Sequence, residues 1–199
     1  MIAGIKIDTK GSLTKEELDS LCADVLKYFN VTVLDENQIE TADGYVSSFN
    51  SLTYPKEITI AGNKTDTHWL VNSSMCIMSE FDADGYHYKV KEINTATETN
   101  FNDAGTDTST NKRPISGQTA AGHEVNGYTY NEMSTIYGHY YVKFGDDKYV
   151  AYEIVLEGAA DIPAAQELVS EANAGALHEK FIGFLNDFIS SGKETPKTE

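Results

Sequence analysis

The chain has 199 residues, of which 40% are hydrophobic and 23% are charged, and this balance is typical of a globular protein rather than a disordered chain. Its 31 acidic and 15 basic residues give a formal net charge of −16, which repels nucleic-acid phosphates and anionic membrane surfaces. No apolar run reaches the ~18–20 residues that are needed to cross a bilayer. We therefore expect one globular domain over residues 1–199, with no nucleic acid among its partners and no direct membrane insertion.

The first predicted element is a helix from Leu13 to Phe29. Thr14 and Glu17 have the spacing of a capping box, in which each side chain caps the backbone of the other residue. Apolar residues then recur at helical spacing along one stripe, which consists of Leu18, Leu21, Cys22, Val25, Leu26 and Phe29. We expect this N-terminal helix to pack its stripe against a sheet.

Strand patterns separated by turn residues follow in residues 31–93. The strongest are an apolar stretch from His68 to Phe81 and an alternating stretch from Tyr86 to Ile93, which we predict to pair across the turn at residues 82–85. Weaker strand patterns occupy residues 31–34 and 58–60, while residues 45–49 fit either a strand or a short helix.

The turn at residues 82–85 contains the nearest approach to a metal motif. Glu80, Asp82 and Asp84 place oxygens at alternate positions and a glycine follows, as at the start of an EF-hand calcium loop. However, Lys91 stands where such a loop needs a bidentate glutamate, and strands rather than helices flank the turn. We interpret the segment as a hairpin turn and keep calcium as the alternative.

The histidines and cysteines predict no cofactor. The histidines lack the close pair with a third ligand that a zinc site requires, and Cys22 and Cys76 lack CxxC spacing. We expect both cysteines to be buried thiols, with a disulfide between them as the alternative. His68 and Trp69 either line the edge of a pocket or form a partly exposed pair on a strand.

Residues 94–122 differ in kind from the rest of the chain. They are rich in Thr, Asn, Asp, Gly and Ser and contain little to bury beyond Phe101 and Ile115. Loops of this length are usually functional or mobile. We therefore predict a polar surface excursion here.

The clearest pattern in the chain is the stretch Ile136–Leu156. Two runs of β-branched and aromatic residues flank a Gly-Asp-Asp break, which predicts a hairpin whose three-residue loop sets Phe144 opposite Lys148. That register pairs apolar residues, whereas a shift by one residue turns the apolar faces apart. The other predicted pairs are Val142 with Val150, Tyr140 with Tyr152, and Gly138 with Ile154.

The two faces of this hairpin have different predicted roles. The face of Tyr140 and Val142 builds core. Tyr137, His139 and Tyr141 alternate on the other face, where they form either a second core layer under helices or an aromatic surface for a protein or glycan partner. Together with His68 and Trp69, these three residues are the candidate binding surface.

Two helices are predicted to close the chain. The first runs from Pro163 to Asn173 and the second, with one apolar face, from Ala176 to Ser190, followed by Gly192 as C-cap and a mobile tail over residues 192–199. The expected fold class is therefore α+β, with a central antiparallel sheet packed by the N-terminal helix and the C-terminal helices.

The hairpin YGHYYVKFGDDKYVAYEIVL and the helix HEKFIGFLNDFISS resemble the end of the PsbP-like family of α/β-sandwich domains. The shared feature is an aromatic hairpin followed by a closing amphipathic helix. The resemblance implies an antiparallel sheet between helices and a non-catalytic binding or assembly role. The long N-terminal helix departs from the family pattern.

Motifs of common enzyme classes are absent, among them the GxSxG elbow, the P-loop and the GxGxxG fingerprint. We expect no catalytic residues and a non-enzymatic binding or accessory protein. The Asn-, Thr-, Tyr- and Gly-rich composition favours an exported or cell-surface bacterial domain, although no signal peptide is visible. Two alternatives stay open: an enzyme or small-ligand carrier whose site assembles only in three dimensions, around His68, Trp69 and His87, and a structural subunit of a surface assembly in which residues 94–122 order against a neighbour.

Overall fold

The structure is a computed structural model of the chain. The residues that it describes are 14, 16, 17, 20, 40, 41, 44–47, 49, 50, 52–70, 76–109 and 111–194. Within these ranges antiparallel strands dominate and helices accompany them, so the α+β class is confirmed.

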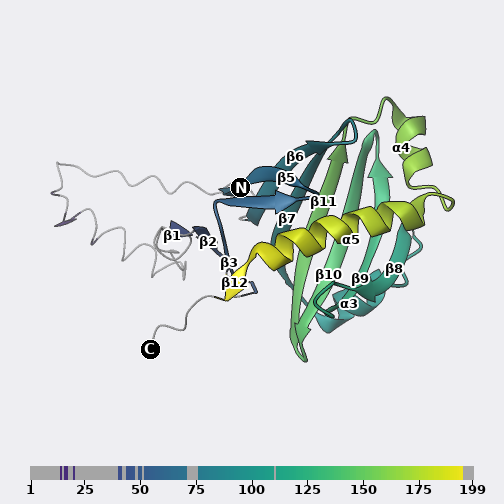
Figure 1. The fold of residues 1–199 in the computed structure, drawn as a ribbon. Helices are drawn as coiled ribbons and strands as arrows, with labels where there is room; N and C mark the ends of the chain where they lie inside the picture. Colours follow the sequence, from purple (N-terminus) through teal and green to yellow (C-terminus); the bar gives the residue numbers. More distant parts are fainter. Residues whose placement is uncertain are drawn as a thin grey trace.

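Eight strands form the main sheet, in the order β4-β5-β6-β7-β11-β10-β9-β8, and a small sheet has the order β1-β2-β3-β12 (Figure 1). The main sheet consists of two meanders, β4 to β7 and β8 to β11, which join where β7 pairs with β11. The element bounds are β1 Glu40–Thr41, β2 Gly44–Val46, β3 Leu52–Tyr54, β4 Glu57–Ile60, β5 Asn63–Leu70, β6 Cys76–Ala83, β7 Tyr86–Ala96, α3 Glu98–Ala104, β8 Arg113–Gln118, β9 Glu124–Glu132, β10 Thr135–Gly145, β11 Lys148–Glu157, α4 Ile162–Leu168, α5 Ala174–Ser191 and β12 Lys193–Glu194.

The hairpin β10–β11 has the predicted register everywhere except at its loop. Gly145 pairs with Lys148 and the register shifts between Lys143 and Gly145, so Phe144 is left out of the pairing. The predicted three-residue loop is therefore wrong, because a bulge at Phe144 shortens the connection to the two residues that hairpin twist favours. The confirmed pairs are Val142 with Val150, Tyr140 with Tyr152, and Gly138 with Ile154.

One face of the main sheet, which we call the helix face, carries the core under α5 (Figure 1). Tyr140 and Tyr152 are fully buried there and meet Phe181 and Phe188 of α5 edge-to-face, each with ring centroids 6.4 Å apart. Such pairs add to the burial of their apolar surface. The predicted helix 176–190 and its buried apolar face are confirmed, with bounds two residues earlier and one later.

A buried histidine of α5 is hydrogen-bonded at both ring nitrogens. Nε2 of His178 lies 2.8 Å from the carbonyl oxygen of Arg113, which can only accept, so Nε2 carries the hydrogen. Nδ1 then accepts a hydrogen bond from Tyr140 Oη at 2.9 Å. Burial lowers the pKa of His178, which favours the neutral ring that this arrangement requires.

The opposite face of the main sheet, which we call the far face, is partly covered by α3. Phe101 packs on Tyr149 of β11 with ring centroids 5.3 Å apart, and Asn126 Nδ2 donates to the Phe101 carbonyl oxygen at 2.9 Å. The segment 94–122 thus contains the end of β7, helix α3 and edge strand β8 rather than only an excursion. The polar composition of this segment was interpreted as that of a loop. Thr97 and Asn100 are polar because they form the capping box at the start of α3, and the same residue types are common in loops.

The hairpin turn between β6 and β7 is confirmed. Asp84 and Gly85 have φ values of 53° and 81°, as two-residue hairpin turns require. Lys180 Nζ donates to Asp84 at 2.9 Å, and His87 Nδ1 lies 2.8 Å from Asp82, so these carboxylates have separate partners. Among the described residues no group of three or more His, Cys, Asp or Glu could hold a metal ion, which leaves the calcium alternative without a site at Glu80, Asp82 and Asp84.

The predicted helix Leu13–Phe29 lies almost wholly outside the described residues. Thr14 and Glu17 do exchange the capping-box hydrogen bonds, at 2.9 and 3.2 Å. Packing of this helix on the sheet and burial of Cys22 stay predictions, and the strand pattern at 31–34 also lies outside the described residues. Cys76 is a free and buried thiol.

The C-terminal elements follow the prediction in outline. Helix α4 has Asp161 as N-cap and Pro163 in its first turn, but it ends at Leu168 instead of Asn173, because the chain turns there to enter α5. Gly192 caps α5, and residues 193 and 194 pair with β3, so the tail is not free from residue 192 onward. Among the helices that the structure describes, none has the length and apolar character of a membrane span.

Candidate functional site

Four aromatic rings stand side by side on the far face, on β9 and β10. Strand register places Tyr130 opposite Tyr137 and Tyr128 opposite His139. Because side chains alternate along a strand, all four point to the same face, and directly opposite residues lie close enough for their rings to touch. We call Tyr128, Tyr130, Tyr137 and His139 the aromatic column.

The rings of the aromatic column are stacked. The centroids of Tyr137 and Tyr130 are 5.3 Å apart with an interplanar angle of 19°, those of Tyr130 and His139 are 5.8 Å apart at 27°, and those of His139 and Tyr128 are 5.5 Å apart at 17°. The rings are nearly parallel but offset, so each covers only part of its neighbour, and Tyr130 Oη lies 3.5 Å from His139 Nε2 within the column.

A lysine ends the column at Tyr128. Lys112 Nζ lies 4.2 Å from the centroid of the Tyr128 ring, which is the geometry of a cation–π contact. Asp107 holds the ammonium group at 2.6 Å, and this hydrogen bond is the main reason why the pKa of Asp107 falls to about 2. The column thus ends in a positioned positive charge.

A row of charged groups adjoins the column across the sheet. Glu153 on β11 accepts a hydrogen bond from Lys91 Nζ at 2.6 Å, and its second oxygen lies 3.5 Å from His139 Nε2. The side chains of His139 and Glu153 are only 20% and 18% exposed. Burial lowers the pKa of His139 while Glu153 opposes that shift, so a neutral ring prevails at neutral pH and Lys91 balances the carboxylate.

The structure brings three of the predicted site residues together. Tyr137 and His139 belong to the aromatic column, and Tyr141 lies beside Tyr128 on the same face, half-buried, with a pKa that burial raises. These residues are neither fully exposed nor a second core layer.

The other two predicted residues lie elsewhere. His68 shares the far face but is four strands from His139, which is roughly 19 Å at ~4.8 Å per strand. Trp69 points to the helix face and packs against the core. His87 lies at the start of β7 and forms a hydrogen bond with Asp82. The structure therefore does not assemble a site around His68, Trp69 and His87.

Sequence reasoning missed four members of this site: Tyr128, Tyr130, Lys112 and Glu153. The two tyrosines had a signal, because residues 124–132 alternate in burial as a strand does and precede the hairpin directly. Lys112 and Glu153 had none, since their contacts depend on pairing between strands and on the path of a loop.

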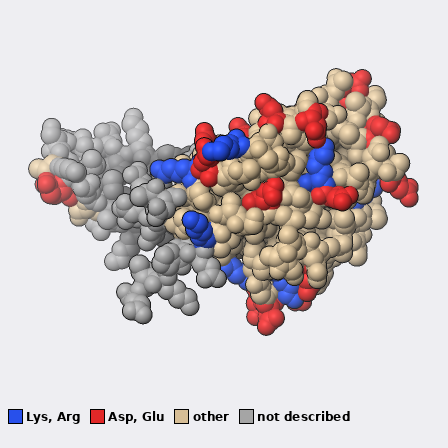
Figure 2. All heavy atoms as spheres, in the orientation of Figure 1, with Lys and Arg blue, Asp and Glu red and all other residues tan. Residues whose placement is uncertain are grey.

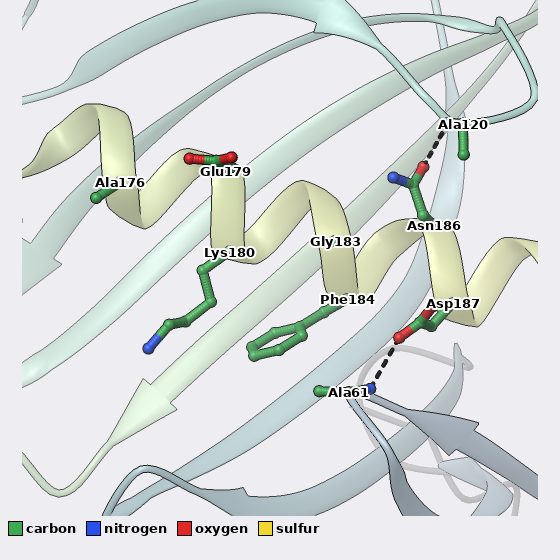
Figure 3. A pocket seen from close by; sticks show the side chains of 9 residues that line it. All are labelled: Ala61, Ala120, Ala176, Glu179, Lys180, Gly183, Phe184, Asn186 and Asp187. Atoms are coloured by element: carbon green, nitrogen blue, oxygen red, sulfur yellow. Dashed lines mark hydrogen bonds between the residues drawn. The ribbon is translucent and has the colours of Figure 1, made fainter.

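The second candidate site is a hollow along the outward side of α5 (Figure 3). Its volume is about 580 Å³, within the range of small-molecule sites. Turns at both edges of the main sheet form its walls: Ala61 N donates to Asp187 Oδ2 at 2.8 Å, and Ala120 N donates to Asn186 Oδ1 at 2.9 Å (Figure 3). Both sheet edges are therefore fastened to adjacent residues of one helix, and we call the space between them the α5 groove.

The lining of the α5 groove combines small residues with charges of both signs. Ala176 and Gly183 leave room along the helix, while Glu179 and Lys180 stand at its side. Acidic and basic side chains are interspersed on this side of the molecule (Figure 2). The α5 groove is thus lined by small and charged side chains, whereas the aromatic column is built from stacked rings.

Comparisons with protein-family models, with curated proteins and with solved structures found no significant match to this chain.

Proposed function

We propose that this chain is a non-enzymatic binding or accessory protein that recognises a protein partner through the aromatic column. The observation that carries the proposal is the stack of half-buried rings on the paired strands β9 and β10. Tyrosine is enriched at protein interfaces because it offers apolar area and a hydrogen-bonding hydroxyl at a low entropic cost.

A protein partner fits the stack better than a glycan does. A sugar ring packs its apolar side on a free aromatic face, and in the column each ring is flanked by a nearly parallel neighbour that occupies part of that face. Ring edges and hydroxyls instead suit backbone carbonyls and side chains of a protein. Lys112 and the Lys91–Glu153 pair add charges at the rim, where they favour orientation more than affinity.

The family resemblance and the cellular setting are also parts of this proposal. The resemblance of the hairpin and the closing helix to PsbP-like domains implies a binding or assembly role, and the composition favours an exported or cell-surface setting.

Site-specific photo-crosslinking tests the proposal. A benzophenone amino acid at Tyr137, introduced into the full chain in its native cells, should yield one discrete protein adduct. Glu80 provides the matched control position, because it is exposed on the same row of the far face three strands away. The adduct should disappear when Tyr130→Ala removes the neighbouring ring.

Two outcomes would contradict the proposed protein partner. Equal adducts at positions 137 and 80, or an adduct that survives Tyr130→Ala, would show that the column is not the binding surface. Saturable binding of a neutral oligosaccharide that Tyr130→Ala abolishes, without any protein adduct, would replace the protein by a glycan.

A small-ligand carrier is the second candidate function, and the α5 groove favours it. The groove joins three segments that are distant in sequence, as a site assembled only in three dimensions must. Gly183→Trp introduces a bulky side chain into the groove, and the position accepts a Cβ because no atom lies within 4 Å of a Cβ built there. Loss of ligand-induced thermal stabilisation in this variant, with the column intact, would support the carrier.

A further inference from the structure

Glu92 is a buried carboxylate that neither the aromatic column nor the α5 groove uses. It lies on β7 with its side chain on the helix face, opposite Tyr152 on one side and Ile77 on the other. Its exposed fraction is 0%. A glutamate is almost never buried so completely unless it has partners, because loss of hydration penalises its charge.

Four hydrogen-bond donors converge on the Glu92 carboxylate. Ser47 Oγ and Asn50 Nδ2 donate to it from the connection between β2 and β3. The hydroxyl of Tyr54 on β3 donates at 2.8 Å, and that of Tyr152 on β11 donates at 3.1 Å. Three of the four donors therefore come from residues 44–54 of the small sheet, and the carboxylate ties that segment to the main sheet.

The same segment also fixes the chain after α5. The ring of Tyr54 stacks on Phe188 with centroids 4.7 Å apart, and β3 pairs with β12, which directly follows the helix. Ser47 and Asn50 have further hydrogen bonds within their own turn, so the turn can move as a unit. Release of the carboxylate would loosen residues 44–54 and β12 together.

The groups that face Glu92 influence its pKa and its hydrogen bonds in each protonation state. Tyr54, Tyr152 and Lys148 are the titratable ones, while Ser47, Asn50, Ile77 of β6 and Phe188 of α5 do not titrate in this range. Burial raises the pKa of Glu92 above its ordinary 4.5, and the hydrogen bonds and Lys148 offset only part of that shift. Once protonated, the carboxyl can donate to the oxygen of Tyr54 or Tyr152, since a hydroxyl also accepts, whereas Ser47 Oγ already accepts from the backbone N–H groups of Phe49 and Asn50.

We propose that Glu92 is a pH-sensitive latch, whose protonation holds residues 44–54 on the main sheet and whose ionisation loosens them. When the segment opens, water reaches Glu92 and its pKa returns towards 4.5. The closed state therefore binds more protons between pH 4.5 and the raised pKa, so a rising pH shifts the equilibrium towards opening by up to about tenfold per pH unit.

Amide hydrogen exchange of the full chain between pH 4.5 and 8.5 tests the latch. After correction for intrinsic exchange rates, the protection of residues 44–54 should fall as pH rises in the wild type and stay constant in Glu92→Gln. Glu157→Gln is the matched control, because it removes a carboxylate of β11 that is paired with Lys89 on the far face. This control should keep the wild-type pH dependence.

Tyr54→Phe provides an independent arm if Glu92→Gln fails to fold. It keeps a ring to stack on Phe188 but removes one donor to the carboxylate, so the transition should move to higher pH. Protection that is independent of pH in the wild type, a pH dependence that persists in Glu92→Gln, or a transition that moves to lower pH in Tyr54→Phe would each overturn the latch.

Discussion

The two faces of the main sheet make opposite use of tyrosine. On the helix face Tyr140 and Tyr152 are fully buried, meet phenylalanines of α5 edge-to-face, and have hydroxyls paired with His178 and Glu92. On the far face Tyr130 and Tyr137 are half-buried and stack on each other. The difference teaches that coverage by a helix, rather than residue type, decides whether an aromatic row becomes core or surface.

The largest expected difference between the faces is in packing. Phe181→Ala removes a fully buried ring that touches Tyr88 and Tyr140, and we expect the free energy of unfolding to fall by about 3–5 kcal/mol. Tyr137→Ala on the far face should cost less than about 1.5 kcal/mol. Urea unfolding at 25 °C measures both values, and similar losses would erase the distinction between core and surface.

Glycine provides the next contrast. A Cβ at Gly138 would lie 2.6 Å from the Phe181 ring and 2.7 Å from the Tyr140 ring, so Gly138→Ala should destabilise the protein by about 1–3 kcal/mol. Gly145→Ala is the matched control on the same strand, because nothing lies within 4 Å of its Cβ position. The same unfolding assay compares them, and a neutral Gly138→Ala would show that the core under α5 is looser than these contacts indicate.

Hydroxyl removal separates the faces more finely. Tyr140→Phe leaves Nδ1 of His178 buried without its donor, and we expect a loss of about 1–2 kcal/mol. Tyr137→Phe should be neutral, because within the described part of the chain its hydroxyl has no hydrogen bond. Differential scanning calorimetry measures the melting temperatures of the two variants, and an equal shift in both would contradict the expectation.

The smallest effect concerns His139. Because its pKa lies below the ordinary 6.5, the unfolded chain binds more protons just below that pH, and stability should fall as pH drops through this window. His139→Gln should flatten this part of the stability profile. Glu153→Gln should lower the pKa of His139 further while leaving His178 on the other face unchanged, and NMR titration of the imidazoles checks both shifts.

An opposite result in that titration would be informative. A rise in the pKa of His139 in Glu153→Gln would mean that the carboxylate does not stabilise the imidazolium across the 3.5 Å contact. A simultaneous change at His178 would mean that the two faces communicate through the sheet.

Local patterns predicted much of the fold. The alternation around Tyr140 and Val142 predicted the register of β10–β11, since a slip by one residue would have exposed an apolar face. Turn residues predicted the β6–β7 hairpin, and helical spacing predicted α5. The polar segment 94–122 was harder, because α3 and β8 gain their stability from contacts with β9 and β11 rather than from their own composition.

The candidate site was predicted only in part for the same reason. Tyr137, His139 and Tyr141 share one strand, so their common face follows from the two-residue period. Trp69 was grouped with His68 as a neighbour in sequence, yet adjacent strand residues point to opposite faces.

The sequence by itself determined the elements and the local registers, because side-chain period, turn chemistry and helix caps act over a few residues. Only the tertiary structure decided that β7 pairs with β11, that Tyr128 and Tyr130 complete the aromatic column, and that the edges of the sheet are fastened to α5. It also placed the carboxylate of Glu92 among donors up to 60 residues away. These contacts join segments that no local period relates, and they form only when the apolar faces of the meanders and α5 are buried together.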